Sequence, residues 1–165
     1  MTLDLRDVAG VPGHSAAFDY SPDLSELMSD DVLSVVGAPR AHGVARNDAG
    51  VLTLRAELDI RLLCVCARCL KEFELDVSQT LEVSLSESED AEDDPEYYRV
   101  VGASLDLDYV IVTELLLRKD ARLLCREDCR GLCPRCGANL NEGDCGCKPE
   151  GDPRLAVLAQ LLDEI

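Results

Sequence analysis

The sequence has few of the residues on which several common functions depend. It contains no tryptophan and only six aromatic residues in all, so a platform for stacking unpaired bases is not expected. Its two histidines, His14 and His42, stand apart from one another. No Ser/His/Asp grouping, glycine-rich phosphate loop or HExxH helix occurs. We therefore predict neither an enzymatic activity nor a small-molecule substrate.

Long apolar runs are also absent. No stretch approaches the roughly 18 apolar residues that a membrane-spanning helix needs. The opening MTLDLRDVAGVPG carries acidic residues early and lacks the basic start and apolar run of an export signal. These features predict a cytoplasmic protein without a membrane partner. In that compartment thiols stay reduced, and a dense cysteine group indicates a metal site before a disulfide framework.

Basic residues are outnumbered two to one, and the formal net charge is −17. The imbalance is uneven, because eight basic residues face seven acidic ones between Arg118 and Arg154. Nearly all the negative charge therefore belongs to the rest of the chain. An acidic body repels phosphate, which disfavours nucleic-acid binding over the whole surface and favours a basic partner.

Two long stretches alternate between apolar and polar residues. In VLTLRAELDIRLLC the apolar positions run in steps of two from Leu52 to Leu62, and a second run follows from Phe73 to Leu85. A period of two predicts strands with one buried face, and their closeness in sequence predicts an antiparallel hairpin. Continuing both inward faces into the turn CVCARCLK places three thiols on the buried side, those of Cys64, Cys66 and Cys69.

Shorter elements are expected around this hairpin. Residues 2–8 and 32–37 read as short strands, and NDAG at 47–50 as a turn into the long strand. SPDLSELMSD predicts a short helix with Ser21 as N-cap and Pro22 in its first turn. A strand beginning at Leu105 and Leu107 is followed by a helix through Leu117, with Asp106 or Asp108 as its cap.

The chain ends in DPRLAVLAQLLDEI, which predicts a terminal helix with one apolar stripe. The overall expectation is an α+β fold, with an antiparallel β-rich body, a few short helices, and a C-terminal zinc knuckle plus helix. We place the body at residues 1–118 and the cysteine-rich knuckle with its terminal helix at 119–165.

An acidic segment, SESEDAEDDPE at 86–96, interrupts the body with seven acids and no large apolar residue. Such a composition predicts a solvated loop. We favour a solubilising insertion, and the alternative is a docking segment for a basic partner.

Six of the nine cysteines fall within LCREDCRGLCPRCGANLNEGDCGC, at 124–147. Their type and spacing predict a structural zinc site closed by four thiolates. The strongest part is Cys133-Pro134-Arg135-Cys136-Gly137, in which two sulfurs two residues apart reach one ion and Gly137 permits the turn. The six candidate ligands are Cys125, Cys129, Cys133, Cys136, Cys145 and Cys147.

Six candidates exceed four coordination places, so the ligand set stays open at this stage. We favour Cys133 and Cys136 in any site, with the second pair drawn from Cys129 or Cys125 and from Cys145 or Cys147. Use of both Cys145 and Cys147 would need a tight C-x-C chelate, which is less usual. A metal cluster with shared thiolates is the alternative, and it could recruit the hairpin thiols.

The hairpin cysteines Cys64, Cys66 and Cys69 have two readings. We favour buried small apolar residues over ligands of a second metal. A thioredoxin-like redox role for Cys66 and Cys69 is weaker still, because the pair follows a strand and does not open a helix in a βαβ unit.

Three arginines, Arg126, Arg130 and Arg135, lie on the short loops of the cysteine segment. Guanidinium groups held on rigid loops could contact phosphates or carboxylates of a partner. We favour the simpler interpretation that they offset the negative charge of a zinc–thiolate centre and of the adjacent acids.

The cysteine motifs carry a family resemblance. C-A-R-C-L at 66–70 after a long alternating strand, then L-C-R-E-D-C-R-G-L-C-P-R-C-G-A-N-L-N, C-G-C and D-P-R-L-A-V-L, resemble the bacterial YceD family, which is named for accumulation of large-subunit ribosomal RNA. The resemblance covers nearly the whole chain and is strongest from Leu123 onward. The family's cysteines map onto Cys66, Cys69, Cys125, Cys129, Cys133, Cys136, Cys145 and Cys147. The resemblance does not indicate which of these cysteines would bind a metal ion together.

This resemblance implies a non-enzymatic ribosome biogenesis factor that supports accumulation or processing of large-subunit ribosomal RNA. Its partners would be that RNA, a basic ribosomal protein, or both. Two alternatives are a zinc-stabilised acidic adapter in transcription or stress response and, third, a thiol oxidoreductase that uses Cys66 and Cys69.

Overall fold

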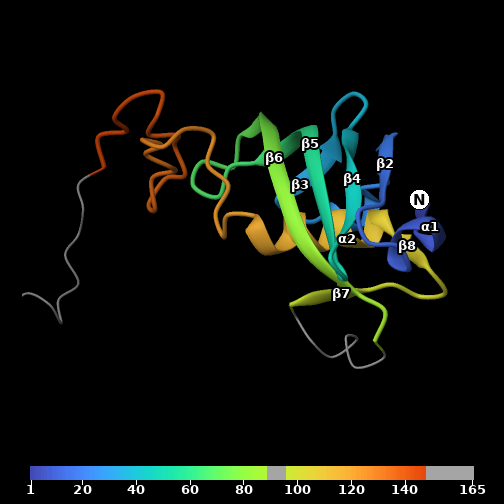
Figure 1. Cartoon of the computed structure of the whole chain (residues 1–165). Coiled ribbons are helices and arrows are strands. Elements are labelled where there is room, and N and C mark those ends of the chain that lie inside the picture. The colour runs from blue at the N-terminus through green and yellow to red at the C-terminus, as the bar shows by residue number, and fades with distance from the viewer. Residues whose placement is uncertain (89–95, 148–165) are drawn as a thin grey trace, which may run out of the picture.

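A computed structural model describes residues 1–88 and 96–147 of the chain (Figure 1). The chain is rich in sheet and has few helices, as the alternating patterns predicted. The elements, in order, are β1 Thr2–Asp4, α1 Arg6–Ala9, β2 Ser15–Tyr20, the 3₁₀ turn η1 Ser25–Leu27, β3 Val32–Val35, β4 Arg40–Asp48, β5 Val51–Val65, β6 Glu72–Ser86, β7 Tyr97–Arg99, β8 Ser104–Asp106 and α2 Leu107–Arg118.

The centre of the fold is the long antiparallel hairpin of β5 and β6, which confirms the predicted pairing. Its register runs from Leu52 opposite Leu85 to Val65 opposite Glu72. Because the alternation is unbroken along β5, every second side chain from Leu52 to Cys64 is buried. The turn with the CARC sequence therefore closes a hairpin held in register along both strands.

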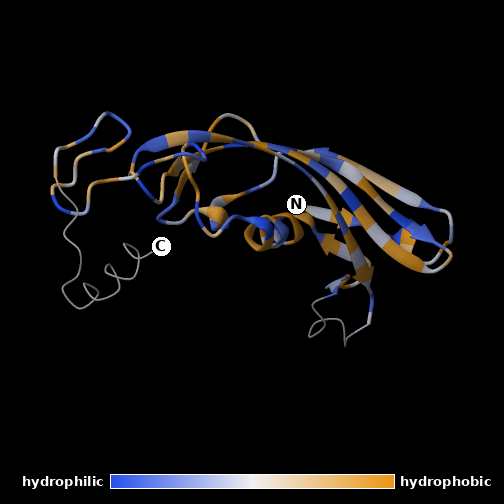
Figure 2. Ribbon diagram, turned by 90° about the vertical axis from the view of Figure 1, so that its left-hand side faces the viewer, coloured by the Kyte–Doolittle hydropathy of each residue, from blue (hydrophilic) through white to orange (hydrophobic). Residues whose placement is uncertain are grey.

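The hairpin is extended on both sides. The other edge of β5 is shared between β4, which pairs with residues 51–59, and β3, which pairs with residues 62–64. On the far side of β4 lies β2, and β7 pairs in parallel with the end of β6. A separate two-stranded sheet joins β1 to β8. The main sheet arches over α2, which lies across its apolar inner face (Figure 2).

Helix α2 fills the core under this arch. Asp106 caps it, accepting hydrogen bonds from the amides of Asp108 (3.1 Å) and Tyr109 (3.4 Å). Its β-branched residues Val110 and Ile111 disfavour a helix intrinsically, but both side chains are fully buried. Tertiary burial thus outweighs local propensity. The predicted helix is confirmed, and of the two candidate caps, Asp106 and Asp108, the first is the one present.

One polar side chain inside the core ties α1 to the β4–β5 turn. Asn47 is 2% exposed. Its amide nitrogen donates to the carbonyls of Val8 (2.9 Å) and Ala9 (2.8 Å), and its side-chain oxygen accepts from the amide of Gly50 (2.8 Å). These bonds give the Ala9 carbonyl a donor at the end of a one-turn helix, and they add a second donor to the Val8 carbonyl, which also accepts the Val11 amide (3.3 Å).

Asn47→Leu should therefore destabilise the protein, because it leaves the Ala9 carbonyl and the Gly50 amide without the partner that Asn47 gives them. We expect a loss of about 1–3 kcal/mol in the free energy of unfolding. Urea titration followed by circular dichroism measures it. The exposed neighbour Asp48→Asn serves as the control, and equal effects of the two changes would contradict the assigned role of Asn47.

Several local expectations need correction. The helix predicted at 21–30 is only the turn η1, because the side chain of Asp108 accepts the amide of Asp23 and that of Asp23 accepts the amide of Ser25. Ser21 caps nothing in this turn, whose N-cap is Leu24. Leu107 opens α2 and does not continue a strand. Strands β2 and β4 were not predicted.

Two predictions concern residues that the structure does not describe. Most of the acidic segment and the terminal helix lie outside the described residues, which omit 89–95 and 148–165. The boundary between residues 118 and 119 stays a prediction. Within the part that the structure describes, no helix is both long and apolar enough to cross a membrane.

Candidate metal centres

All nine cysteines are free thiols, and eight of them form two groups of four. Within each group the sulfur atoms lie within 4.8 Å of one another. We call the group of Cys66, Cys69, Cys125 and Cys129 site I. The group of Cys133, Cys136, Cys145 and Cys147 is site II. Either group could hold a metal ion.

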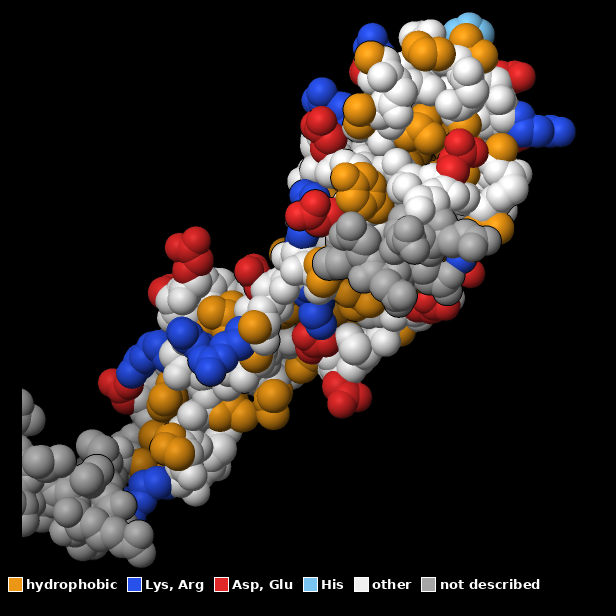
Figure 3. All heavy atoms as spheres, turned by 60° about the horizontal axis from the view of Figure 1, so that its bottom comes forward, with side chains coloured by type: hydrophobic (Ala, Val, Ile, Leu, Met, Phe, Trp, Pro, Cys, Tyr) orange, Lys and Arg blue, Asp and Glu red, His pale blue; other side chains and the backbone are white. Residues whose placement is uncertain are grey.

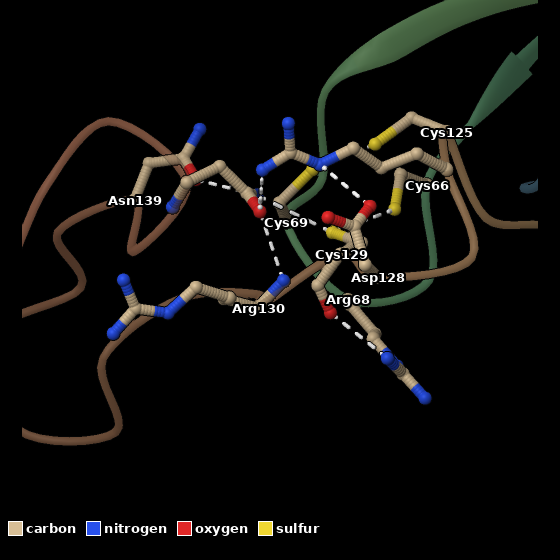
Figure 4. A network of polar contacts seen from close by, with 10 residues as sticks. Cys66, Arg68, Cys69, Cys125, Asp128, Cys129, Arg130 and Asn139 are labelled. Atoms are coloured by element: carbon tan, nitrogen blue, oxygen red, sulfur yellow. Dashed lines mark hydrogen bonds and ion pairs between the residues drawn. The ribbon is translucent and has the colours of Figure 1, made fainter.

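Site I joins two distant parts of the chain. Cys66 and Cys69 lie in the turn between β5 and β6, whereas Cys125 and Cys129 lie in the segment after α2 (Figure 4). The sulfurs of Cys66 and Cys129 are 3.7 Å apart, and so are those of Cys69 and Cys125. A zinc ion with Zn–S bonds of about 2.3 Å places sulfurs about 3.8 Å apart at tetrahedral angles. The observed separations fit such an ion.

The turn that carries Cys66 has the form of a zinc knuckle. The amide of Cys66 donates to the carbonyl of Lys71 (2.9 Å), and the amide of Leu70 donates to the carbonyl of Cys66 (2.9 Å). Leu70 has a φ of 58°, in the left-handed region. A branched side chain costs about 1 kcal/mol in this conformation, so the surrounding turn must hold it there.

The turn of site II repeats this geometry. The amide of Cys133 donates to the carbonyl of Ala138 (2.8 Å), and the amide of Gly137 donates to the carbonyl of Cys133 (2.9 Å). Gly137 has a φ of 72°, matching Leu70. The sequences C-A-R-C-L and C-P-R-C-G are thus two copies of one turn, with arginine in the third place of each.

Backbone amides lower the pKa of the first thiol in each turn. Burial raises the pKa of Cys66, but the amides of Cys125, Cys69 and Arg68 outweigh it and lower this pKa to about 6. The amides of Cys136 and Arg135 likewise lower the pKa of Cys133 to about 6. Both turns therefore present a sulfur that ionises readily, as a metal ligand must.

Other thiols of the two sites resist ionisation. Burial and the neighbouring sulfurs raise the pKa of Cys125 to about 12. In site II, Cys136 and Cys145 raise the pKa of Cys147 to about 12. Four thiolates cannot coexist at these separations without a compensating cation, and a divalent ion supplies that charge.

A mesh of backbone bonds holds the cysteine segment against the hairpin turn. The amide of Ala67 donates to the carbonyl of Leu123 (2.8 Å), and that of Leu132 donates to the carbonyl of Arg68 (3.2 Å). Gly131 permits this crossing, since its φ is 75° and a Cβ there would stand 3.0 Å from the Arg68 carbonyl oxygen. The hairpin and the segment therefore form one support for site I.

Asn141 buttresses site I from the loop of site II. Its side-chain nitrogen donates to the sulfur of Cys129 (3.3 Å). Its oxygen accepts from the Arg130 amide (2.8 Å) and from the Arg126 guanidinium (2.7 Å). The sequence alone does not indicate this role of Asn141, because nothing in the cysteine spacing shows which sulfur its side chain contacts.

The predicted cysteines thus divide in a way that spacing did not show. Cys133 and Cys136 group with both Cys145 and Cys147, so the group includes the C-x-C pair that we had disfavoured. Cys125 and Cys129 join the hairpin pair Cys66 and Cys69, which we had favoured as buried apolar residues. A signal was available, since the CARC and CPRC motifs share their spacing.

Cys64 belongs to neither group. It is fully buried in the main core, and burial raises the pKa of its thiol. In the β5–β6 register it lies opposite Phe73. Of the three hairpin cysteines, Cys64 alone therefore fits the interpretation as a buried small apolar residue.

The arginines of the cysteine segment make internal contacts. The guanidinium of Arg126 lies 3.3 Å from the Asp128 carboxylate, and that of Arg130 lies 2.6 Å from the Asp144 carboxylate. Arg135 is exposed in the CPRC turn. Basic side chains gather over this end of the molecule in Figure 3. The ion pairs of Arg126 and Arg130 agree with the charge-offset reading, and a partner contact stays a prediction.

Comparison with known proteins places this geometry in a family. The family described as "Large ribosomal RNA subunit accumulation protein YceD" matches residues 54–162. That range includes all but the first three residues of β5, all of β6 and α2, and every cysteine of both sites.

Curated relatives are similar over part of their length. Uncharacterised proteins of Mycobacterium tuberculosis (Rv2926c) and Mycobacterium bovis (Mb2951c) are each 32% identical to this chain. Each alignment covers 59% of the chain and 49% of the relative, so the chain spans about half the length of the curated relatives it matches. No solved structure matches the chain.

Proposed function

The chain belongs to the YceD family, and from this membership we propose that it is a non-enzymatic ribosome biogenesis factor acting in the cytoplasm. It would support accumulation or processing of large-subunit ribosomal RNA, the role for which the family is named. The observation that carries the proposal is the match over residues 54–162, which include both cysteine sites.

We further propose that sites I and II each bind one structural zinc ion. Four thiolates favour zinc among the common divalent ions, and four protein ligands leave no open position for a substrate. The ions would fix the hairpin turn and the cysteine segment as one rigid end of the molecule. The side chains that supply sulfur are the eight of sites I and II.

The purified chain should accordingly contain two zinc ions. Elemental analysis of protein prepared under reducing conditions should give about two per chain, since each site holds four thiols. Replacement by Co²⁺ should produce the visible absorption of tetrahedral thiolate coordination. A value near one, or thiolate bands that fit bridged ions, would contradict two separate sites.

The partners we propose are large-subunit ribosomal RNA, a basic ribosomal protein, or both. A net charge of −17 supports a basic protein as the direct contact, because the body repels phosphate. The less acidic cysteine segment, with Arg126, Arg130 and Arg135, is the part that could approach RNA.

Depletion of the protein in its own cells tests the function. Sucrose-gradient sedimentation should show a deficit of large subunits relative to small ones, and a plasmid copy of the intact gene should restore the ratio. Growth rate is matched between cultures, because slow growth alone lowers ribosome content. An unchanged ratio in depleted cells would refute the proposed role.

A zinc-stabilised acidic adapter in transcription or stress response is the second candidate, and the net charge of −17 is the observation that favours it. Affinity capture separates the two, because an adapter would return no ribosomal components. The thiol oxidoreductase is less favoured, because Cys66 and Cys69 are not an isolated pair: each also lies 3.7 Å from a thiol of the other segment, within a group of four sulfurs.

A further inference from the structure

One edge of β6 lacks a strand partner along most of its length. β5 covers one edge throughout, and on the other edge β7 pairs only with residues 84–86 (Figure 1). Among the residues that the structure describes, no strand pairs with residues 72–83 on that side. An exposed edge of this length is a template for a strand from another chain.

Two hydrogen bonds show which backbone groups face this edge. The carbonyl of Ser86 accepts the amide of Val100 (2.8 Å), and the carbonyl of Thr80 accepts the guanidinium of Arg118 (3.3 Å). Because backbone groups alternate in direction along a strand, those of Glu74, Asp76 and Ser78 point the same way. No described residue hydrogen-bonds to the backbone of these three on this edge.

The two faces beside the edge differ in chemistry. On the solvent face β6 presents a row of acids, Glu72, Glu74 and Asp76. On the inner face, Phe73, Leu75 and Val77 are only half-buried. A strand added here would therefore meet acids with one set of alternate side chains and apolar groups with the other.

A groove beside the inner face gives those apolar side chains a place to pack. It has a volume of about 260 Å³, and Leu62, Leu75, Val77, Leu115 and Leu123 are among its lining residues. The side-chain oxygen of Gln79, which also lines it, has no hydrogen-bond partner among the described residues.

Three basic residues near the edge, Arg61, Arg118 and Lys119, are already paired. Arg61 contacts Asp76 (2.5 Å) and Glu74 (3.6 Å), and Arg118 contacts Glu114 (2.8 Å). Lys119, at the groove, contacts Asp31 at 2.8 Å. Glu74 and Asp76 share Arg61, and Glu72 makes no ion pair with any described residue. The row therefore keeps an excess of negative charge.

We infer that the free edge of β6 binds an extended segment of a basic protein by strand addition, with Lys or Arg alternating with Val, Ile or Leu. The backbone groups of Glu74, Asp76 and Ser78 would supply the hydrogen bonds, the acid row would pair with the basic side chains, and the groove would take the apolar ones. This rests on the proposed function, in which a basic ribosomal protein is a direct partner.

A synthetic peptide tests the inference on the full chain. A fluorescent nine-residue peptide alternating Lys and Val should bind, whereas one alternating Glu and Val should not. N-methylation of one alternate set of its amides should abolish binding and N-methylation of the other set should not, a pattern that strand addition alone produces. If both methylated peptides bind, or if neither binds, the inference is overturned.

Charge reversal on the protein supplies a second arm. Glu74→Lys should weaken binding at least about tenfold, because it places a cation where the peptide's lysines lie. Glu87→Lys changes the net charge equally but lies past the end of β6, and it should leave binding within about twofold. Equal effects of the two would overturn the inference, and unchanged melting temperatures show that both variants are folded.

Other occupants appear as distinct outcomes. Binding of a labelled RNA oligonucleotide to the chain without any binding of the peptide, or peptide binding only when the chain is cut after Cys147, would overturn the inference in favour of RNA or of the chain's own residues 148–165. A large-subunit deficit in depleted cells together with no peptide binding would support the proposed function and refute strand addition at the edge of β6. Peptide binding together with a normal ratio of ribosomal subunits in depleted cells would support strand addition and refute the proposed function.

Discussion

Replacing Cys66 and Cys69 together by serine should remove one of two zinc ions and detach the cysteine segment from the hairpin. Structural zinc in small domains contributes about 10–16 kcal/mol of apparent binding free energy, so the few bonds that remain cannot hold the segment. Hydrogen–deuterium exchange should rise sharply across residues 120–147 and at Ala67, whose amide bonds to Leu123. The exchange of β5 and α2 should change little, because their core lies elsewhere.

The matched change in site II should act locally. Cys136→Ser with Cys147→Ser also removes one zinc ion, but all four ligands of site II come from residues 133–147. Exchange should therefore rise there and stay low at Ala67. Cys64→Ala, which alters a core thiol outside both sites, should keep two ions per chain. Loss of both ions in either double variant would show instead that the eight thiols form one cluster.

This contrast follows from which contacts each ion bridges. Site I joins sulfurs 56 and 63 residues apart in the chain, whereas those of site II all come from one short loop. An ion at site I thus opposes the large entropy of separating two segments, and an ion at site II opposes only the opening of its own loop. The two sites have equal ligands and unequal structural consequences.

The hairpin and α2 could be predicted because their signals are local. Period-two alternation indicates the buried face of β5, and a short acidic side chain before an apolar run indicates the start of α2 to within two residues, at Asp106 or Asp108. The helix expected at 21–30 was wrong because a distant carboxylate, Asp108, holds the amide of Asp23. No propensity scale contains that contact.

The presence of cysteine groups that could hold a metal ion could be predicted, but not which cysteines form each group. Cysteine type and C-x-x-C spacing are sufficient to indicate thiolate sites. Which thiols share an ion depends on where the hairpin turn meets the segment after α2, and that follows from backbone bonds such as Ala67 to Leu123. Leu70 hides the repeat further, because the left-handed position that glycine fills in CPRCG holds leucine in CARCL.

Strand β4 was missed because its buried side is made of small residues. Ala41 and Ala45 are fully buried, and Gly43 lies between them, so hydropathy alternates weakly. The small side chains are a packing requirement. Gly43 pairs with Phe18 of β2 on one side and with Ala56 of β5 on the other. The ring of Phe18 lies over the space that a larger residue at 43 would need.

Gly43→Ala should consequently be among the most destabilising single changes in the body. A Cβ at this position would overlap the carbonyl oxygen of Arg55 and stand 2.8 Å from the Ala56 Cα and 2.9 Å from the Phe18 ring. Two of these atoms belong to the backbone of β5, so relief requires the β4–β5 pairing to open locally. We expect a loss of about 2–4 kcal/mol in the free energy of unfolding, by overpacking against an immobile neighbour.

Gly10→Ala is the matched control, because a Cβ there meets nothing within 4 Å and the φ of Gly10 is −86°. It should leave stability within about 1 kcal/mol of the parent, or raise it slightly by restricting the unfolded chain. Denaturant titration of both variants with two zinc ions bound gives the comparison. If Gly43→Ala matched Gly10→Ala, the sheet could move aside at β4, and the tight packing of Phe18 on Gly43 would not be what sets the spacing of β2, β4 and β5.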